Sequence, residues 1–417
     1  MIMGRDGIIC LVFINDSLGE LDWIAPFVNR AAKENYSFLI YLNLPGKSVI
    51  EKQDIYSQYF ADHDQIILLN SDVEIPSWLA TLDRYLNSIL RRISGKSYML
   101  FLMLRFFTDL LRKLLGGLMR LFYVVPGYDI LMRDYNLKDS FALAALSHSG
   151  EVVKTCIFPH STAIQSNKQD TAKRPPKMVN ADLFLENTSL STQFSESYSS
   201  VFVACGSPQI EEFVKGEKSL ADFEGNSILF ITRNCDPRFF GFSYESAGVV
   251  FKDALTWANN NNIHVFVKHH PRDSRLDYWR SIQSEFDNVT EVMTSLNSFS
   301  DPISFAFCFY TSACLLLTSR GVPVFDVSPY AGDVKNLPFH YLDDDGDIIH
   351  ELIEYRMCGR VRMLEDFFDR QCPSYLQEAA VDQLQALLTN LPIDTYAIID
   401  ASLKRVINNR PVVDVGL

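Results

Sequence analysis

The sequence predicts an α/β protein made of two Rossmann-like domains that face each other across a cleft. Continuous apolar runs of strand length alternate with segments of helical spacing in both halves of the chain, which is typical of buried parallel strands covered by helices. The chain has 417 residues, enough for about two domains. Apolar residues make up 47% and charged residues 21% of it, which is a globular composition.

Residues 1–204 are assigned to the first domain. Strands are expected at 7–14, 37–44 and 64–70, where apolar residues continue for the length of a strand. The first apolar run has no small-residue cleavage site after it, so we interpret it as a strand and not as a signal peptide. A polar segment at about 165–178 contains two adjacent prolines and is expected to form a mobile loop.

Residues 205–373 are assigned to the second domain, with the crossing between domains near 206–208. Its strands are expected within segments 226–234, 263–274 and 322–328. Residues 374–417 are expected to form helices that can pack back on the first domain. Ligands of open α/β sheets bind beyond the carboxyl ends of the strands, so functional residues are expected there.

Charge and cysteine spacing exclude several classes of protein. The chain has 38 Lys and Arg against 51 Asp and Glu, so its net charge of −13 disfavours general nucleic-acid binding. Cysteines occur at positions 10, 156, 205, 235, 308, 314, 358 and 372. No two lie within four residues of each other, so no metal site is predicted. Several lie inside apolar runs as small hydrophobic residues, which favours a reducing, cytoplasmic location.

The best candidate for a functional site follows the strand within residues 263–274. Five residues come at its carboxyl end: Lys268, His269, His270, Pro271 and Arg272. Cations and imidazole N–H groups there suit a phosphate, because a leaving phosphate needs its growing charge stabilised. A solvated basic turn is the alternative. The common dinucleotide and P-loop motifs are absent from the sequence.

A second candidate lies at a strand-to-helix turn, where Thr311 and Ser312 precede an apolar helix. A Ser or Thr at this position caps the helix, and capping alone would explain why either residue occurs there. The same helix start also offers free N–H groups and a favourable dipole to a phosphate. Both interpretations remain open.

Carboxylates and one histidine are the candidates in the first domain. Asp16, Glu20 and Asp22 follow the first strand, where a carboxylate can act as a general base. The alternative is that these charges complement the dipole of the following helix. His160 follows a later strand and either contacts an acceptor or phosphate or caps a loop.

Several of these segments resemble GT-B glycosyltransferases. VKHHPRDS resembles the H-P turn of bacterial sialyltransferases and of capsule or lipopolysaccharide transferases that use CMP-activated sugars. YTSA and RGVPVFDV resemble the Ser-Ser/Thr motif and the G-x-P-V strand of the same enzymes. ACGSPQIEEF is similar to the G-[SN]-P turn of surface-polysaccharide transferases, which CDP-glycerol glycerophosphotransferases share. GELDWIAPFV is similar to their acceptor-domain pattern.

The resemblance implies a role for each matching residue. His270 would hydrogen-bond the donor phosphate, and Lys268 and Arg272 would add positive charge. The other nucleotide contacts it implies are His269, Pro271, Thr311, Ser312, Gly206, Ser207 and Arg233. The base would come from Asp16, Glu20 or Asp22, with the last two ranked first, although DSLGELD departs from the acidic motif of sialyltransferases.

The function that the resemblance implies is metal-independent transfer of a sugar from a nucleotide sugar to a glycan hydroxyl. The expected donor is a CMP-linked sugar that resembles sialic acid or Kdo, and the expected process is capsule or lipopolysaccharide synthesis. Inversion of the configuration at the anomeric carbon is the default expectation. No cofactor is expected besides the nucleotide-sugar substrate. The alternatives are a CDP-glycerol-type phosphotransferase, a nucleotide-sugar epimerase, and a non-catalytic assembly partner of a polysaccharide synthesis machine.

Residues 91–120 form a basic, apolar segment within this acidic chain. They hold seven Lys and Arg against one Asp, and apolar and basic residues alternate at helical spacing over 98–115. The apolar run is too short to cross a bilayer, and Gly116–Gly117 is expected to end or kink the helix. The helix either lies on an anionic membrane, near a lipid-linked acceptor, or packs on the sheet of the first domain.

Overall fold

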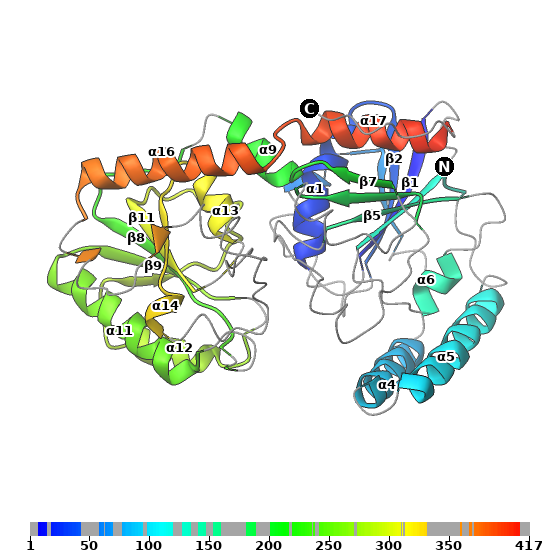
Figure 1. Cartoon of the computed structure of the whole chain (residues 1–417), viewed down its shortest axis with the longest axis horizontal. Coiled ribbons are helices and arrows are strands. Elements are labelled where there is room, and N and C mark those ends of the chain that lie inside the picture. The colour runs from blue at the N-terminus through cyan, green and yellow to red at the C-terminus, as the bar shows by residue number, and fades with distance from the viewer. Residues whose placement is uncertain are drawn as a thin grey trace, which may run out of the picture.

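The polypeptide forms two domains, each built on one parallel sheet (Figure 1). The computed structural model describes residues 7–14, 18–42, 58–61, 63–69, 77–94, 98–119, 127–134, 141–146, 153–159, 181–188, 201–216, 219–235, 237, 242–270, 273–309, 311, 313–331, 359–360, 367–368 and 371–408. The fold is therefore the predicted pair of Rossmann-like α/β domains.

The first sheet has seven parallel strands in the order β3-β2-β1-β4-β5-β6-β7. Its strands are β1 (Ile8–Ile14), β2 (Tyr36–Leu42), β3 (Ile66–Leu68), β4 (Ile130–Asp134), β5 (Lys154–Phe158), β6 (Leu183–Glu186) and β7 (Val201–Ala204). The strand order reverses between β1 and β4, and this reversal is where doubly wound sheets open a ligand site.

Apolar side chains from both faces of this sheet explain its stability. All seven residues of β2 are buried, which matches their continuous apolar sequence. Helix α1 (Leu18–Ala32) covers one face, with Trp23 stacked on Phe158 and Phe27 packed edge-on against Phe38. The indole N–H of Trp23 donates to Asn187, which follows β6, so α1 is also bonded to the end of that strand.

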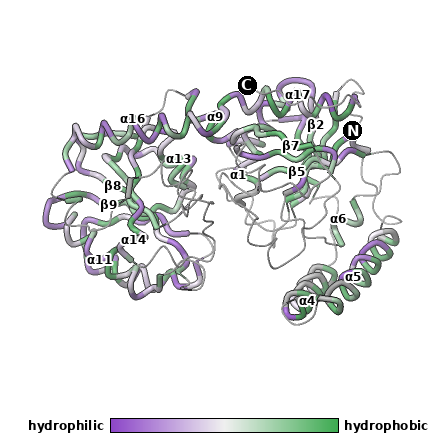
Figure 2. The backbone as a smooth tube through the Cα atoms, viewed as in Figure 1, coloured by the Kyte–Doolittle hydropathy of each residue, from purple (hydrophilic) through white to green (hydrophobic). Residues whose placement is uncertain are grey.

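The second sheet has six parallel strands in the order β10-β9-β8-β11-β12-β13. Its strands are β8 (Ser227–Ile231), β9 (His264–Lys268), β10 (Val289–Glu291), β11 (Phe305–Cys308), β12 (Val324–Asp326) and β13 (Gly359–Arg360). Its order reverses between β8 and β11, so it repeats the winding of the first sheet. Figure 2 shows that the strands of both domains are mostly hydrophobic.

Helices cover the second sheet on both sides. They are α11 (Tyr244–Asn260), α12 (Leu276–Gln283), α13 (Ala313–Thr318), α14 (Ser328–Ala331) and α16 (Pro373–Asn390). On one face, an aromatic cluster forms the centre of the core, with Phe230 against Phe251 of α11 and Phe307 of β11. On the other face, Gln383 of α16 pairs with both backbone groups of Val324, which fixes α16 to β12.

The chain passes between the domains twice. The first passage leads from β7 into α9 (Pro208–Lys215), and the second leads from α16 to α17 (Thr395–Ile407). Helix α17 contributes Ile399 and Leu403 to the core of the first domain, and Asp400 accepts a hydrogen bond from Tyr36. The two terminal helices therefore belong to different domains, as their positions in Figure 1 show.

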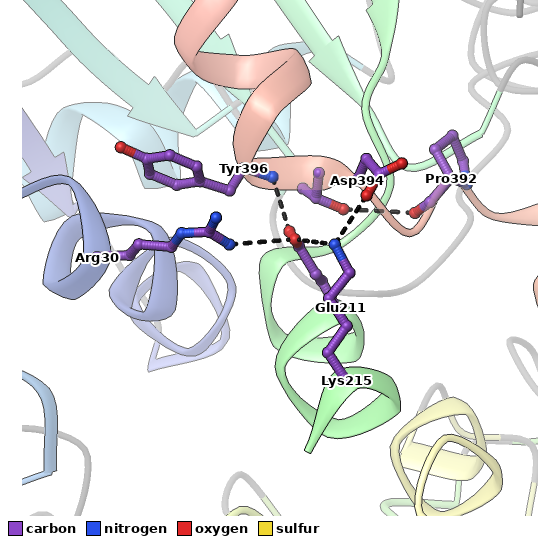
Figure 3. A network of polar contacts seen from close by, with 7 residues as sticks. Arg30, Glu211, Lys215, Pro392, Asp394 and Tyr396 are labelled. Carbon is purple, nitrogen blue, oxygen red and sulfur yellow. Dashed lines mark hydrogen bonds and ion pairs between the residues drawn. The ribbon is translucent and has the colours of Figure 1, made fainter.

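A buried carboxylate holds the two passages together (Figure 3). Glu211 of α9 accepts from the backbone N–H of Tyr396 at 2.7 Å, from Lys215 at 2.8 Å and from Arg30 of α1 at 3.3 Å. Lys215 also pairs with Asp394 at 2.8 Å. This network joins α1, α9 and the start of α17 at one point.

A helical hairpin extends from the first domain away from its sheet (Figure 1). It consists of α4 (Ser77–Ser94) and α5 (Tyr98–Met119), and α5 packs on α6 (Phe141–Leu146). The sequence predicted that Gly116–Gly117 ends or kinks the helix; the first alternative is wrong, because α5 continues through both glycines to Met119. A Cβ on Gly116 would lie 2.8–2.9 Å from Ala144 and Ala145 of α6, so glycine is needed for close helix packing.

Candidate functional site

The candidate site lies where the carboxyl ends of the two sheets approach each other. In the second domain, β8 ends before Thr232 and Arg233, and the neighbouring β9 ends before His269 and His270. In the first domain, β1 leads into α1, which carries Asp22. The positive charge of Lys268 lowers the pKa of Asp22, so these two residues, which belong to different domains, lie within electrostatic range of each other.

His269 is a link within the second domain. Its ring is buried, with Nδ1 2.8 Å from the hydroxyl of Thr232 and Nε2 3.2 Å from the side-chain amide of Gln283. Burial lowers the pKa of this imidazole below its ordinary value. The nucleotide contact of His269 stays a prediction; in the structure its two ring nitrogens tie the turn after β9 to the turn after β8 and to α12.

Lys268 lies at the end of β9 and is half-buried. Its ammonium group donates to the carbonyls of Val292 at 3.2 Å and Thr294 at 2.5 Å. Its charge also reaches Asp22 of the first domain. Lys268 therefore holds the segment after β10 to the end of β9, and its charge acts on a carboxyl of the first domain.

Asp273 anchors the turn that contains the H-P motif. Its buried carboxylate accepts from the hydroxyl of Tyr244 at 2.5 Å, the indole of Trp279 at 2.8 Å and the backbone N–H of Arg275 at 2.9 Å. Its own N–H donates to the carbonyl of His270 at 2.9 Å. Asp273 is not among the residues predicted from the sequence, although an acidic residue two positions after the H-P pair was a usable signal.

Tyr244 extends this anchor to the turn after β8. Its hydroxyl lies 2.9 Å from Asn234 as well as within hydrogen-bond distance of Asp273. The two turns at the end of β8 and β9 are thus held in one arrangement by buried polar contacts. His270 is half-buried at the edge of this arrangement, and Arg233 is half-buried at the end of β8.

Thr311 caps α13. Its hydroxyl accepts from the backbone N–H of Ala313 at 3.3 Å, and its carbonyl accepts from Cys314 at 3.2 Å. These contacts agree with the capping interpretation for Thr311, and its contact with a nucleotide stays a prediction. Its half-buried side chain follows β11, which neighbours β8 in the sheet, so Thr311 shares the edge that holds His270.

Asp22 has the electrostatics of a general base. It lies in the second turn of α1, and its Oδ1 is buried with no hydrogen-bond partner among the described residues. Burial raises the pKa of this carboxyl to about 7, and the positive charge of Lys268 opposes the rise. A carboxyl with a pKa near neutrality can both take and return a proton.

Tyr59 lies near Asp22 on the first-domain side. Its hydroxyl donates to Glu212 of α9 at 2.6 Å, and its titration is influenced electrostatically by Asp22. Burial and the neighbouring carboxylates raise the pKa of this phenol well above its ordinary value. Tyr59 therefore stays protonated and donates to Glu212.

Gly206 and Ser207 lie at the first passage between the domains. Gly206 has φ +81°, and a Cβ there would collide with the carbonyl oxygen of Pro392 in the second passage. Ser207 is buried at the start of α9, and its hydroxyl has no partner among the described residues. Packing of one passage on the other is sufficient reason for the glycine, without a nucleotide.

Several predicted site residues lie outside the part of the chain that the structure describes. These are Asp16, His160, Pro271, Arg272, Ser312 and the side chain of Glu20, together with the expected loop at 165–178. Within the described ranges, no three His, Cys, Asp or Glu side chains are grouped so that they could hold a metal ion.

Comparison with known proteins finds similarity in fold. No protein-family model and no curated protein matches the chain. Among solved structures, UDP-GlcNAc 2-epimerase from Neisseria meningitidis bound to UDP-GlcNAc has a TM-score of 0.52 at 13% identity, over 95% of this chain and 99% of that one. S. aureus MnaA in complex with UDP has a TM-score of 0.54 at 12% identity, over 98% and 100%.

A glycosyltransferase from Rickettsia africae ESF-5 is also similar, with a TM-score of 0.51 at 9% identity over 98% of this chain and 100% of that one. Each likeness spans both domains. At these identities the comparisons establish a two-domain fold of the GT-B type, in agreement with the repeated strand order of the two sheets.

Proposed function

We propose that this protein transfers a sugar from a nucleotide sugar to a hydroxyl group, with Asp22 as the general base. The observation that carries the proposal is the carboxyl of Asp22, whose Oδ1 is buried without a hydrogen-bond partner among the described residues and whose pKa burial raises to about 7. A general base works best when its pKa lies near the working pH. Among the first-domain candidates, Asp22 is the one whose carboxyl environment the structure describes.

The reaction balances with groups on both domains. Asp22 takes the proton of the acceptor hydroxyl, whose oxygen attacks the anomeric carbon of the sugar. The bond from that carbon to the phosphate oxygen breaks, and its electron pair leaves with the nucleotide. Positive charge and N–H donors near Lys268 and His270 would stabilise this leaving group. Attack opposite the leaving phosphate inverts the anomeric centre.

The second domain is the proposed nucleotide domain. Three turns, after β8, β9 and β11, lie on adjacent strands and carry Arg233, His270 and Thr311. Buried contacts through Asp273 and Tyr244 hold two of these turns rigid, and a rigid frame favours binding of a polar group. The H-P resemblance favours a CMP-linked donor, and a surface polysaccharide would be the acceptor.

A nucleotide-sugar epimerase is the second candidate. Two similar structures belong to a UDP-GlcNAc 2-epimerase and to a protein bound to UDP, which favours this possibility at the level of fold. A carboxyl that takes and returns a proton near neutral pH would serve this reaction too. The two candidate reactions differ in their products: a transferase attaches the sugar to an acceptor, whereas an epimerase leaves the altered sugar attached to its nucleotide.

The test is a product analysis combined with a binding screen. Thermal unfolding is measured with CMP, CDP, UDP and GDP, because a ligand that binds the native state raises its stability. The corresponding nucleotide sugars are then incubated with and without oligosaccharide acceptors and with EDTA. Transfer predicts acceptor-dependent release of the nucleotide that survives EDTA. An altered sugar still attached to its nucleotide would establish the epimerase, and binding of none would reject both.

A further inference from the structure

The outer face of α5 carries a large group of exposed apolar side chains. They are Met99, Leu100, Met103, Phe106, Phe107, Leu110, Leu111, Leu114 and Leu118. Phe106 is 67% exposed and Met99 is 70% exposed. Such a patch on a water-soluble domain marks a binding surface, because side chains of this size are ordinarily buried.

These side chains form one continuous surface. At 100° per residue, the nine positions fall within an arc of about 140° on the helix. The opposite arc contains Thr108, Arg112 and Gly116, which are buried toward the rest of the hairpin and α6. Helix α5 therefore packs with its inner side on α4 and α6, and its outer side is exposed. Among the described residues, the main contacts of α5 are with these two helices, and Figure 1 shows it away from the sheet.

The sequence of the hairpin carries a net positive charge. Residues 77–119 hold seven Lys and Arg against two Asp, a net charge of +5 in a chain of −13, so the remaining residues sum to −18. Arg92 of α4 and Lys113 of α5 are exposed. An anionic surface would attract the hairpin and repel the rest of the molecule, which fixes the orientation of binding.

We propose that α4 and α5 bind the surface of an anionic lipid bilayer, with the outer face of α5 inserted among the lipid chains. Interfacial helices combine an apolar face with Lys and Arg that meet the headgroups, and here Lys113 of α5 and Arg92 of α4 are exposed for that role. Among the described helices, none is long and apolar enough to cross a membrane. A second copy of the chain fits less well, because a symmetric contact between two hairpins would bring the same positive charges together.

This inference does not rest on the proposed function, since lipid binding needs no nucleotide. It concerns a surface of the first domain, which is the proposed acceptor domain (Figure 2). An acceptor attached to lipid would reach the protein from this side. A failure of lipid binding would leave the reaction at Asp22 unaffected, and the reverse also holds.

The experiment is flotation of the full-length protein with vesicles of phosphatidylcholine alone or mixed with phosphatidylglycerol. Binding is expected to the mixed vesicles and to fall by about tenfold or more in high salt. Phe106→Ser/Phe107→Ser should abolish it, because two inserted rings are lost. The control is Val249→Ser/Val381→Ser, which alters two apolar side chains of the second domain that are each 59% exposed.

A charge variant tests the electrostatic part. Arg92→Glu/Lys113→Glu should weaken binding to the mixed vesicles by about tenfold or more, with unchanged melting temperature. Arg112 is unsuitable for this purpose because it is 4% exposed and paired with Asp109 at 3.2 Å. Insertion is measured with Phe106→Trp, whose fluorescence brominated lipids should quench, while Val249→Trp should be unaffected.

Three results would overturn the proposal. The first is equal binding to neutral and mixed vesicles, which removes the role of anionic lipid. The second is binding to neither. The third is self-association of the lipid-free protein that Phe106→Ser/Phe107→Ser abolishes, without any binding to vesicles, which would identify a second copy as the occupant of this surface.

Discussion

A carboxyl group buried at Asp22 destabilises the folded protein whenever it is ionised. Its pKa is about 7 in the folded state against 3.8 ordinarily, so the native state binds the proton more tightly than the unfolded state does. Stability should therefore fall as the pH rises from about 4 to 7. Asp22→Asn should abolish this dependence and be more stable than the wild type at pH 8 by roughly 2–4 kcal/mol.

The same variant should be inactive. Loss of a general base costs about 10²–10⁴-fold in turnover, so Asp22→Asn should combine higher stability with greatly reduced activity. Urea unfolding at pH 5 and pH 8 and a turnover assay measure the two effects. Asp64→Asn, at an exposed position, is the control. An Asp22→Asn protein with normal turnover would exclude Asp22 as the base.

Lys268 should control the pH at which Asp22 works. Its positive charge favours the ionised carboxyl, so Lys268→Met should raise the pKa of Asp22 further. The acid limb of the pH–rate profile should then move to higher pH, and Lys268→Arg, which keeps the charge, should stay near the wild type. An unchanged midpoint in Lys268→Met would show that the domains do not meet through this pair during catalysis.

The site residues were predicted from their position after strands, and the partners of their side chains could not be read from the sequence. His269 and His270 are adjacent, yet only His269 is enclosed by Thr232 and Gln283. Those partners lie 37 and 14 residues away in the chain, and the packing of β8 and α12 brings them together. Strand-end position can therefore be predicted from the pattern, whereas the direction of a side chain depends on tertiary packing.

Among the connecting elements, the passage at Gly206 should be intolerant of any side chain. Its φ of +81° is unfavourable for other residues, and a Cβ would meet the carbonyl of Pro392. Gly206→Ala should therefore lose at least about 2 kcal/mol of unfolding free energy. Gly127→Ala is the matched control, since a Cβ there meets nothing within 4 Å. Equal melting temperatures for both variants would contradict this account.

Strands were predicted well and helix ends less well, for a physical reason. The buried strands β1, β2 and β8 are continuous apolar runs that need little more than their own sequence to be identified. Gly116–Gly117 suggested a helix end because glycine weakens an isolated helix. Contact with α6 outweighs that local preference, and such a contact is invisible in a single sequence.

At the scale of the whole molecule, the first domain should depend on the last helix. Tyr396, Ile399 and Leu403 of α17 are buried in its core, and each such side chain contributes about 1.5–3 kcal/mol. A chain ending at residue 391 should lose hydrogen-exchange protection in β1 and β2 and keep it in β8 and β9. A chain ending at residue 408 is the control. Equal protection of β1 in both chains would contradict the dependence.

The position of α17 also sets an order of events during synthesis. The strands of the first domain are complete at Ala204, but α17 begins at Thr395, about 190 residues later. A ribosome adds about 5–20 residues each second, so roughly 10–40 s pass before α17 can reach the first sheet. During that interval Phe27 and Tyr36 lack their contacts with Tyr396 and Asp400 of α17, and the unfinished domain is a natural client for a chaperone. The domain made first is thus the domain finished last.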